Sequence, residues 1–327
     1  MPRSWIRLGF AEAARDGIGR RWTGCPAGGY NATVEAAGGG AGRSERCWVL
    51  KAADSLPRVV IRPRSWWVPV NLRDLWEHRE LLYFLTWRDV KVRYKQTLLG
   101  VAWAVLQPVL TMVVFSVFFG RLARVPSDNL PYPVFAFCGL LPWQMFSRAL
   151  TDASMSLVQQ ERIITKVYFP RLLVPISAVL ASLVDFAVAF VLLIGMMLLY
   201  RIAPSPAAFT LPLFVLLALA TACGVSFWLS ALAVQYRDVR FTLSFLTQIW
   251  LFATPVAYPS SLVPTSLRPY YGLNPMSGVV EAFRWALLGK GQPPGPMLWV
   301  SVAVVAVMFV GGLLYFRRME STFADVI

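Results

Sequence analysis

Residues 172–200 read LLVPISAVLASLVDFAVAFVLLIGMMLLY, a stretch of 29 residues in which Asp185 is the only charge. A transmembrane helix needs roughly 17 to 25 predominantly apolar residues to cross about 30 Å of hydrocarbon. Because lipid offers backbone amides no partner, such a run must close its hydrogen bonds internally, as a helix does. This stretch therefore predicts a membrane-spanning helix.

Five further runs carry no charge and are also long enough to cross a bilayer. The chain is 57% hydrophobic and contains 13 Trp, which is far from the composition of a soluble enzyme and supplies aromatic residues for the membrane interface. The sequence predicts an all-α integral membrane protein with six transmembrane helices. The five further runs are residues 96–120, 129–147, 202–236, 241–267 and 291–316.

Lys and Arg are distributed unevenly over the predicted loops. If both termini are cytoplasmic, the cytoplasmic segments from residue 73 onward carry 13 of these residues and the opposite side carries six. Cytoplasmic loops of membrane proteins hold such an excess. The net charge of +14 therefore indicates topology and contact with anionic lipid headgroups, and nucleic acid is not an expected partner.

The chain divides into three predicted parts. Residues 1–55 are rich in Gly, Ala and Arg and are expected to be a disordered extension, or a spurious one from an upstream start codon. Residues 56–95 are expected to form a cytoplasmic extended segment and an amphipathic helix at the membrane interface, with Asn71 as its N-cap. Residues 96–327 form the six-span transmembrane domain.

Two connections contain shorter predicted helices. Residues 159–169 predict a short amphipathic cytoplasmic helix ended by Pro170, which is either a contact for a soluble partner or a solvated turn. Between the fifth and sixth spans, Asn274 and Pro275 indicate an N-cap and first turn, and Gly289 the end, of a helix of about 14 residues. A helix of that length is too short to cross the bilayer, so we expect re-entrant or interfacial helices here.

No catalytic or metal-binding site is expected. His78 is the single histidine, and the four cysteines have no paired spacing. Asp185 is costly inside a span and should face protein or water. A proton-coupled secondary transporter would use such a residue, but without a basic partner in a neighbouring span a packing or hydrogen-bonding role is favoured.

Several motifs have a more specific resemblance. They include LLYFLTWRDVKVRYKQT at residues 81–97 with Leu99-Gly100, and Gln107-Pro108 in the first span. Further matches are Phe169-Pro170-Arg171, Tyr236-Arg237-Asp238-Val239, Thr254-Pro255-Val256 and Asn274-Pro275. From about Arg58 to the C-terminus, the chain resembles the permease subunit of polysaccharide-exporting ABC transporters of the type-2 exporter family, which move O-antigen, capsule or teichoic-acid chains.

This resemblance implies a homodimer of six-span subunits in the bacterial inner membrane, docked on two cytoplasmic ATPase subunits. A channel at the dimer interface would carry a lipid-linked polysaccharide. The chain lacks a Gly-x-x-x-x-Gly-Lys-Ser/Thr loop, so ATP and Mg²⁺ are expected on the partner subunit and the chain itself is not expected to be an enzyme. The alternatives are an exporter of lipid or drug with the same architecture, or a proton-coupled secondary transporter.

The resemblance and the chemistry of the residues together suggest three groups of functional side chains. A segment resembling the family's coupling helix would contact the ATPase, and a basic face of the interface helix would guide a pyrophosphate headgroup, with lipid anchoring alone as the other reading. Aromatic side chains would line the glycan path, with helix packing as the other reading. The coupling residues are Glu161, Arg162, Ile163, Ile164, Thr165, Lys166 and Tyr168; the headgroup residues Arg88, Lys91 and Lys95; and the path residues Trp143, Phe146, Trp250, Phe252 and Tyr258.

Overall fold

The computed structural model describes residues 76–95, 101–127, 130–167, 169–262, 264, 268–290, 295–320 and 323, which form helices, turns and loops and no strand. All of them lie in one of the two units of the chain, Arg64–Ile327. The extension predicted for residues 1–55, the extended segment before the interface helix and the Asn71 cap lie outside the described residues.

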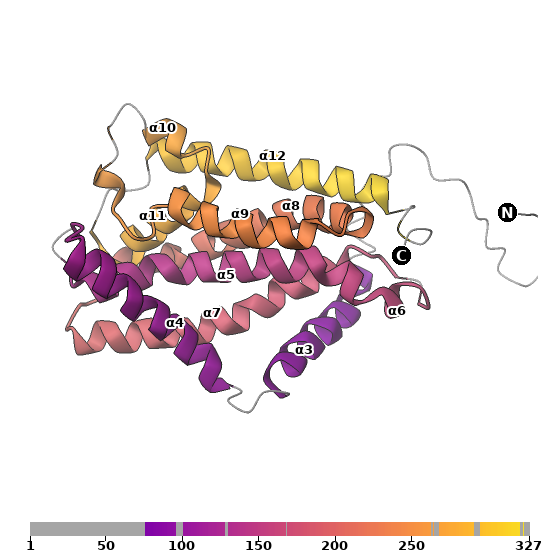
Figure 1. The fold of residues 1–327 in the computed structure, drawn as a ribbon, viewed down its shortest axis with the longest axis horizontal. Helices are drawn as coiled ribbons and strands as arrows, with labels where there is room; N and C mark the ends of the chain where they lie inside the picture. Colours follow the sequence, from indigo (N-terminus) through magenta and orange to yellow (C-terminus); the bar gives the residue numbers. More distant parts are fainter. Residues whose placement is uncertain are drawn as a thin grey trace, which may run out of the picture. The chain divides into compact units, whose positions relative to one another are not determined.

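Long helices make up most of this part of the chain (Figure 1). The long helices are α3 (Arg79–Lys95), α4 (Val101–Phe115), α5 (Tyr132–Gln159), α7 (Leu173–Leu199), α8 (Leu211–Gln235), α9 (Val239–Ala253), α11 (Pro275–Leu288) and α12 (Pro296–Met319). The short elements are the π-helical segment η1 (Ser116–Leu122) that continues α4, the helical turns α6 (Glu161–Ile164) and α10 (Arg268–Tyr271), and the 3₁₀ turns η2 (Pro206–Thr210) and η3 (Ser260–Leu262).

Among the described residues, four helical stretches are long and apolar enough to cross a membrane by length and composition: Val105–Leu122, Leu173–Leu199, Pro206–Gln235 and Pro296–Met319. The predicted second span falls in α5, which has 28 residues and carries charged side chains. The predicted fifth span falls in α9, an apolar helix of 15 residues. The chain is thus a multi-pass membrane protein, and the count of six spans stays a prediction.

α5 is the central helix of the bundle. It packs along both α7 and α8, and α8 packs in turn along α12, while α11 contacts α5, α8 and α12 (Figure 1). The core cluster at one end, which we call the α11 end, contains Val134, Leu193 and Phe283. The cluster at the other end, the α3 end, contains Leu85 and Phe316. A third cluster lies between them.

The two end clusters give the direction of the helices. α5 and α8 begin in the α11 end and finish in the α3 end, whereas α7 runs the opposite way. Leu85 of α3 and Phe323, close to the C-terminus, belong to the same α3-end cluster. The first and last described parts of the chain therefore lie at the same end of the bundle.

α8 and α12 approach each other through glycine. A Cβ on Gly312 would lie 2.8 Å from Cδ1 of Trp228, and a Cβ on Gly224 would lie 2.9 Å from the backbone of Phe309. Small residues allow membrane helices to pack backbone to backbone, where dispersion contacts replace the missing hydrophobic drive. Trp228 then stacks on Tyr315, with ring centroids 4.8 Å apart.

The prediction for α11 is confirmed residue by residue. The helix spans Pro275–Leu288, the Asn274 side chain accepts a hydrogen bond from the Met276 backbone N–H, and Gly289 ends the helix at φ 64° and ψ 9°. The asparagine satisfies an orphan donor of the first turn, and glycine adopts the left-handed conformation without a Cβ penalty. Local chemistry alone therefore sets both ends of this helix.

The helical part of the predicted fifth span is shorter than the uncharged run from residue 241 to residue 267. α9 stops at Ala253, and residues 254–258 form turns and bends. Pro255 lacks a backbone N–H and disfavours the helical conformation of the residue before it. The absence of charge therefore marked where the chain is apolar and did not mark where it is helical.

Candidate functional site

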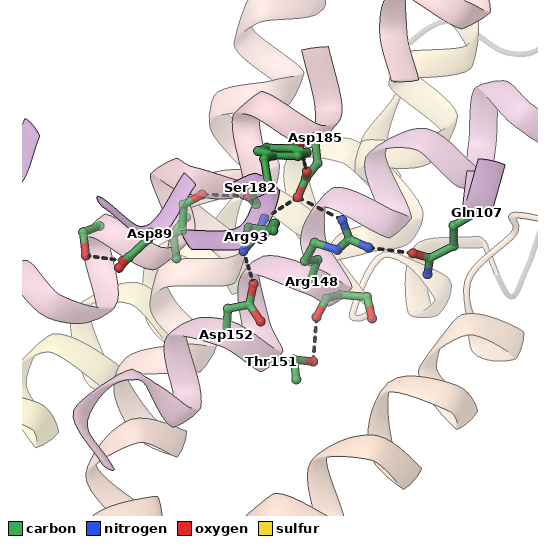
Figure 2. A network of polar contacts seen from close by, with 12 residues as sticks. Asp89, Arg93, Gln107, Arg148, Thr151, Asp152, Ser182 and Asp185 are labelled. Atoms are coloured by element: carbon green, nitrogen blue, oxygen red, sulfur yellow. Dashed lines mark hydrogen bonds and ion pairs between the residues drawn. The ribbon is translucent and has the colours of Figure 1, made fainter. Parts of the chain in front are cut away.

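A network of charged side chains joins four helices, with the carboxylate of Asp185 at its centre (Figure 2). Asp185 Oδ2 accepts hydrogen bonds from Arg93 of α3 and from Nη1 of Arg148 of α5, the latter at 2.9 Å. Asp185 Oδ1 accepts a hydrogen bond from the hydroxyl of Tyr94. The Asp185 side chain is only 11% exposed, so both of its oxygens are engaged inside the protein.

The network extends from Asp185 in two directions. Arg93 also pairs with Asp152 of α5, and Nη2 of Arg148 donates to Oε1 of Gln107 of α4 at 2.8 Å. Two arginines and two aspartates give a formally neutral group. Charges withdrawn from water are expensive unless each has a partner with good geometry, and here each charge has between one and three hydrogen-bond partners.

Tyr94 is held as a hydrogen-bond donor. Burial, and after it the hydrogen bond to Asp185, raises the pKa of the Tyr94 phenol from 10 to about 12. Because the phenol stays protonated at neutral pH, it donates to the carboxylate and adds no negative charge. Tyr94 and Arg93 thus bring two consecutive residues of α3 onto one residue of α7.

These contacts correct one expectation about Asp185. The prediction of a packing role assumed that no basic partner lies in a neighbouring span, whereas Arg148 and Arg93 both contact it. Arg148 follows directly on the last residue of the predicted second span, and α5 continues through it to Gln159. The hydrogen-bonding role stands, and its partners are two arginines and a tyrosine.

The headgroup-guidance residues do not form one free basic face. Lys91 and Lys95 are exposed on α3, while Arg88 is half-buried and pairs with Asp89 at 2.8 Å. Asp89 in turn accepts a hydrogen bond from Ser177 of α7. Lys91 and Lys95 therefore remain the residues accessible to an anionic headgroup, and a role in headgroup guidance stays a prediction.

The predicted coupling helix is one helical turn followed by loop. α6 covers Glu161–Ile164, and residues 165–167 continue as turns and a bend. Glu161, Arg162, Thr165 and Lys166 are exposed, Ile163 is half-buried, and Ile164 is buried in the α3-end cluster. Tyr168 lies outside the described residues. The segment thus anchors one apolar side chain and presents the polar ones, and its contact with an ATPase stays a prediction.

The five predicted glycan-path aromatics occupy different environments. Trp143 and Phe146 are buried, with Phe146 against Trp250 at 5.1 Å between ring centroids. Phe252 is 58% exposed, and the hydroxyl of Tyr258 contacts that of Tyr271. In this chain, Trp143 and Phe146 pack helices together, and Phe252 is the aromatic of this set that presents its ring outside the protein.

Residues 254–257, which we call the strap, form an irregular backbone segment directly after α9 that side chains of other helices hold by hydrogen bonds. Nη2 of Arg284 donates to the carbonyl oxygens of Pro255 and Val256 at 3.2 and 3.0 Å, and Tyr132 donates to that of Ala257 at 2.8 Å. All four strap residues are buried. Irregular backbone at membrane depth must be satisfied in this way when it is enclosed by protein.

Asn274 fixes the end of α9 against the start of α11. Its side-chain Nδ2 donates to the Ala253 carbonyl and to the Thr254 hydroxyl, and its Oδ1 accepts from Trp250 Nε1 at 2.8 Å. One residue therefore caps α11 and ties it to α9. The cap was predicted from the Asn-Pro sequence, whereas the tie to Trp250 has no sequence signal, because the two side chains are brought together by the fold.

The sides of α4 and α9 are largely uncovered in this chain. Of the 15 residues of α9, all described, only Leu243 is buried. α4 likewise presents most of its apolar side chains outward. The large exposed apolar residues of the two helices are Trp103, Leu106, Leu110, Val113 and Val114 on α4, and Phe241, Phe245, Leu246, Ile249 and Phe252 on α9.

The arginines of the network were absent from the predicted site. Arg93 was treated as a topology signal, and Arg148 lies outside every uncharged run. One signal was available, since a single carboxylate within a span requires a cation or a donor from a neighbouring helix. Which cation supplies it follows from the packing of α5 and α3 against α7.

Comparison with known proteins gives matches to most of the chain. The family described as ABC-2 type transporter matches residues 80–288. The O-antigen export system permease protein RfbA of Myxococcus xanthus is 31% identical over 78% of this chain and 98% of its own length. A Klebsiella pneumoniae protein of the same name is 28% identical over 76% and 95% of the two chains. The polysialic acid transport protein KpsM of Escherichia coli is 23% identical over 72% and 92%.

Proposed function

Because the chain belongs to the ABC-2 type transporter family, we propose that it is the membrane-spanning subunit of an ATP-driven exporter that moves a lipid-linked polysaccharide of the O-antigen kind across the bacterial inner membrane. The observation that carries this proposal is the match to almost the full length of a permease named for O-antigen export. Relatives named for O-antigen and for polysialic acid support a polysaccharide as substrate.

The arrangement of the helices supports a topology with both termini in the cytoplasm. The α3 end holds the first and last described residues, and the connections there carry Arg162, Lys166, Arg237 and Arg240. An excess of basic residues on one side favours the cytoplasm for that side. Both termini would then be cytoplasmic, and α9, with the strap and α11 behind it, would complete the fifth crossing, giving six.

ATP and Mg²⁺ belong to a separate subunit in this proposal. The sequence has no phosphate-binding loop of the Gly-x-x-x-x-Gly-Lys-Ser/Thr type. α6 lies at the α3 end, with its polar residues exposed and Ile164 anchored in the core. Two ATPase subunits would dock against this end of two copies of the chain.

The translocation path would form where two copies meet over α4 and α9. Each of these helices leaves apolar and aromatic side chains uncovered, and a second copy would cover part of that surface. Aromatic rings bind sugar C–H faces weakly and without a fixed hydrogen-bond register, which suits a moving chain. Phe252 would touch the glycan, with Trp250, Trp143 and Phe146 packed behind it and Tyr258 beside the strap.

The test is co-purification followed by transport. The tagged chain is extracted from its own membranes in mild detergent, and an ATPase subunit is expected to co-purify near one to one and to hydrolyse ATP. Deletion of the gene should leave lipid-linked glycan on the cytoplasmic face, and the intact gene should restore export. If an ATPase co-purifies but glycan export is unaffected by the deletion, the substrate is a different one, such as a lipid or drug. Recovery of the chain alone would contradict the proposal.

A further inference from the structure

We propose that Asp185 is a positioning residue for transport, because it joins the interface helix α3 to α5 and α4 and so transmits movement from the ATPase-facing end to a helix that borders the path. This inference rests on the proposed function. It concerns a residue that touches neither ATP nor glycan and that acts through Arg93 and Arg148.

The first link runs from α6 to α3. Ile164 of α6, Phe169 of the following loop and Leu85 of α3 belong to one buried cluster at the α3 end. Close-packed apolar groups are not continuously deformable, so a displacement of one is felt by its neighbours. A push on the exposed side of α6 would therefore reach α3.

The second link runs from α3 to α7. Arg93 and Tyr94 lie in the last turn of α3, two turns beyond Leu85, and both donate to Asp185. Figure 2 shows the contact between Arg93 and Asp185. Arg93 additionally pairs with Asp152 of α5. In a water-poor environment, hydrogen bonds to charged groups are strong and directional. The last turn of α3 is thus held to α7 and α5 by directional charged contacts.

The third link runs from Asp185 to α4. Arg148 and Arg93 both donate to Oδ2 of Asp185. Nη2 of Arg148 also donates to Oε1 of Gln107. One carboxylate oxygen therefore receives guanidinium groups from two helices, and one guanidinium bridges α7 and α4 (Figure 2). If α3 moves, Asp185 loses a partner unless Arg148 and Gln107 follow.

Two features separate this role from a binding or proton-carrying one. The four charged groups, Arg93, Arg148, Asp152 and Asp185, are formally neutral together, so the cluster has no excess charge with which to attract an anionic headgroup. Both Asp185 oxygens already accept hydrogen bonds, so uptake of a proton by either oxygen would first require the donor or donors bound there to leave or turn. A residue that positions helices needs neither excess charge nor proton transfer.

The test compares export per ATP hydrolysed in the complex with its ATPase subunit, reconstituted in proteoliposomes with lipid-linked glycan. For Asp185→Asn we expect assembly and ATP hydrolysis to be retained and glycan moved per ATP to fall about tenfold, within the range of ordinary site-to-site coupling. Asp185→Glu, which keeps the carboxylate, should recover most of the ratio. Glu281→Gln, a carboxylate-to-amide change in α11 and outside the three links, is the matched control and should leave the ratio unchanged.

Other outcomes are equally decisive. If Asp185→Asn does not assemble, Arg148→Gln cuts the link to α4 while leaving Arg93 and Tyr94 on Asp185, and the same fall in the ratio is expected. The positioning role of Asp185 would be contradicted if export and ATP hydrolysis declined in proportion. It would also be contradicted if glycan moved per ATP were unchanged in both Asp185→Asn and Arg148→Gln. Export driven by an imposed pH gradient and lost in Asp185→Asn would overturn it in favour of a proton site. Failure of the wild-type complex to export glycan contradicts the proposed function instead.

Discussion

α9 and α11 are separated by only 21 residues in the chain, have 15 and 14 residues and are both rich in apolar side chains, although α11 also carries Glu281 and Arg284. They are buried to opposite extents. Only Leu243 of α9 is buried, whereas 12 of the 14 residues of α11 are. α11 contacts α5, α8 and α12, while α9 has few contacts with α5 and α8. Two helices of similar length and apolar content thus have opposite environments: α11 lies inside the bundle and α9 lies on its surface.

The difference follows from side-chain size. α11 presents Ser277, Gly278, Ala282 and Ala286, which let neighbouring helices approach closely. α9 presents large side chains, including Phe241, Phe245 and Ile249. In lipid, burial of apolar area gives little drive by itself, so fit decides which helix enters the core. α9 is then the helix whose apolar side chains stay available for contacts outside this chain.

Loss of Arg284, which links α11 to the strap after α9, should lower stability more than any other change considered below. Arg284→Met leaves the buried carbonyls of Pro255 and Val256 without that donor, at a cost of about 3 kcal/mol. We expect a clearly lowered thermal unfolding midpoint in detergent. Arg240→Met, at the exposed start of α9, is the control and should shift the midpoint little. Equal midpoints for the two variants would mean that the strap is held by other contacts.

Truncation of one phenylalanine on each helix tests the comparison directly. Phe283 of α11 is fully buried and Phe245 of α9 is 66% exposed. Phe283→Ala should cost about 2 kcal/mol, because in lipid mainly the cavity part of the penalty remains. Phe245→Ala should leave the midpoint unchanged and reduce cross-linking between two copies. If Phe245→Ala unfolded the protein and Phe283→Ala did not, α9 rather than α11 would be the helix packed inside the bundle, which would contradict the comparison.

Added volume should distinguish filled from open positions. A Cβ on Gly278 would lie 2.8 Å from Cβ of Ser301 on α12, whereas nothing lies within 4 Å of a Cβ on Gly195 of α7. Gly278→Val should lower stability by about 2 kcal/mol through overpacking, and Gly195→Val should not. Fluorescence-detected size-exclusion chromatography of both variants measures this. A normal monodisperse profile for Gly278→Val together with an unchanged midpoint would refute the tight α11–α12 contact.

Loss of the Asn274 cap should give the smallest effect. Asn274→Ala removes the bond to the Met276 N–H and the contacts to Trp250 and Thr254, at a cost of about 1 kcal/mol. Asn274→Asp keeps the cap acceptor but loses the donors to Ala253 and Thr254. An intermediate midpoint for Asn274→Asp is expected. If it matched wild type, the tie to α9 would contribute nothing measurable.

Sequence signals succeeded where the deciding chemistry is local. Asn274-Pro275 and Gly289 predicted the ends of α11 correctly, and the apolar stretch 172–200, in which Asp185 is the only charge, predicted α7 within a residue or two. α9 was extended too far because an apolar composition continues past the proline at 255. α6 was predicted too long because alternating polar and apolar residues fit a turn as well as a helix.

The polar contacts were less accessible to prediction. Asp185 was recognised as costly within a span, but its partners lie 37 and 92 residues away in the chain. Trp143 and Phe146 were selected for a chemistry that requires exposure, and exposure is a property of the assembled bundle. Arg88 was placed with Lys91 and Lys95 by helical spacing, yet its neighbour Asp89 engages it.

The amino-acid sequence determined that this chain spans the membrane, which of its stretches are apolar and how α11 begins and ends, because hydropathy and capping act over a few consecutive residues. Only the tertiary structure decided that Asp185 receives two arginines, that Arg284 holds the strap after α9, and which of two similar apolar helices is enclosed. Those outcomes depend on which helix surfaces fit together. In a membrane protein both the buried and the lipid-facing surfaces are apolar, so composition does not indicate which of them is buried.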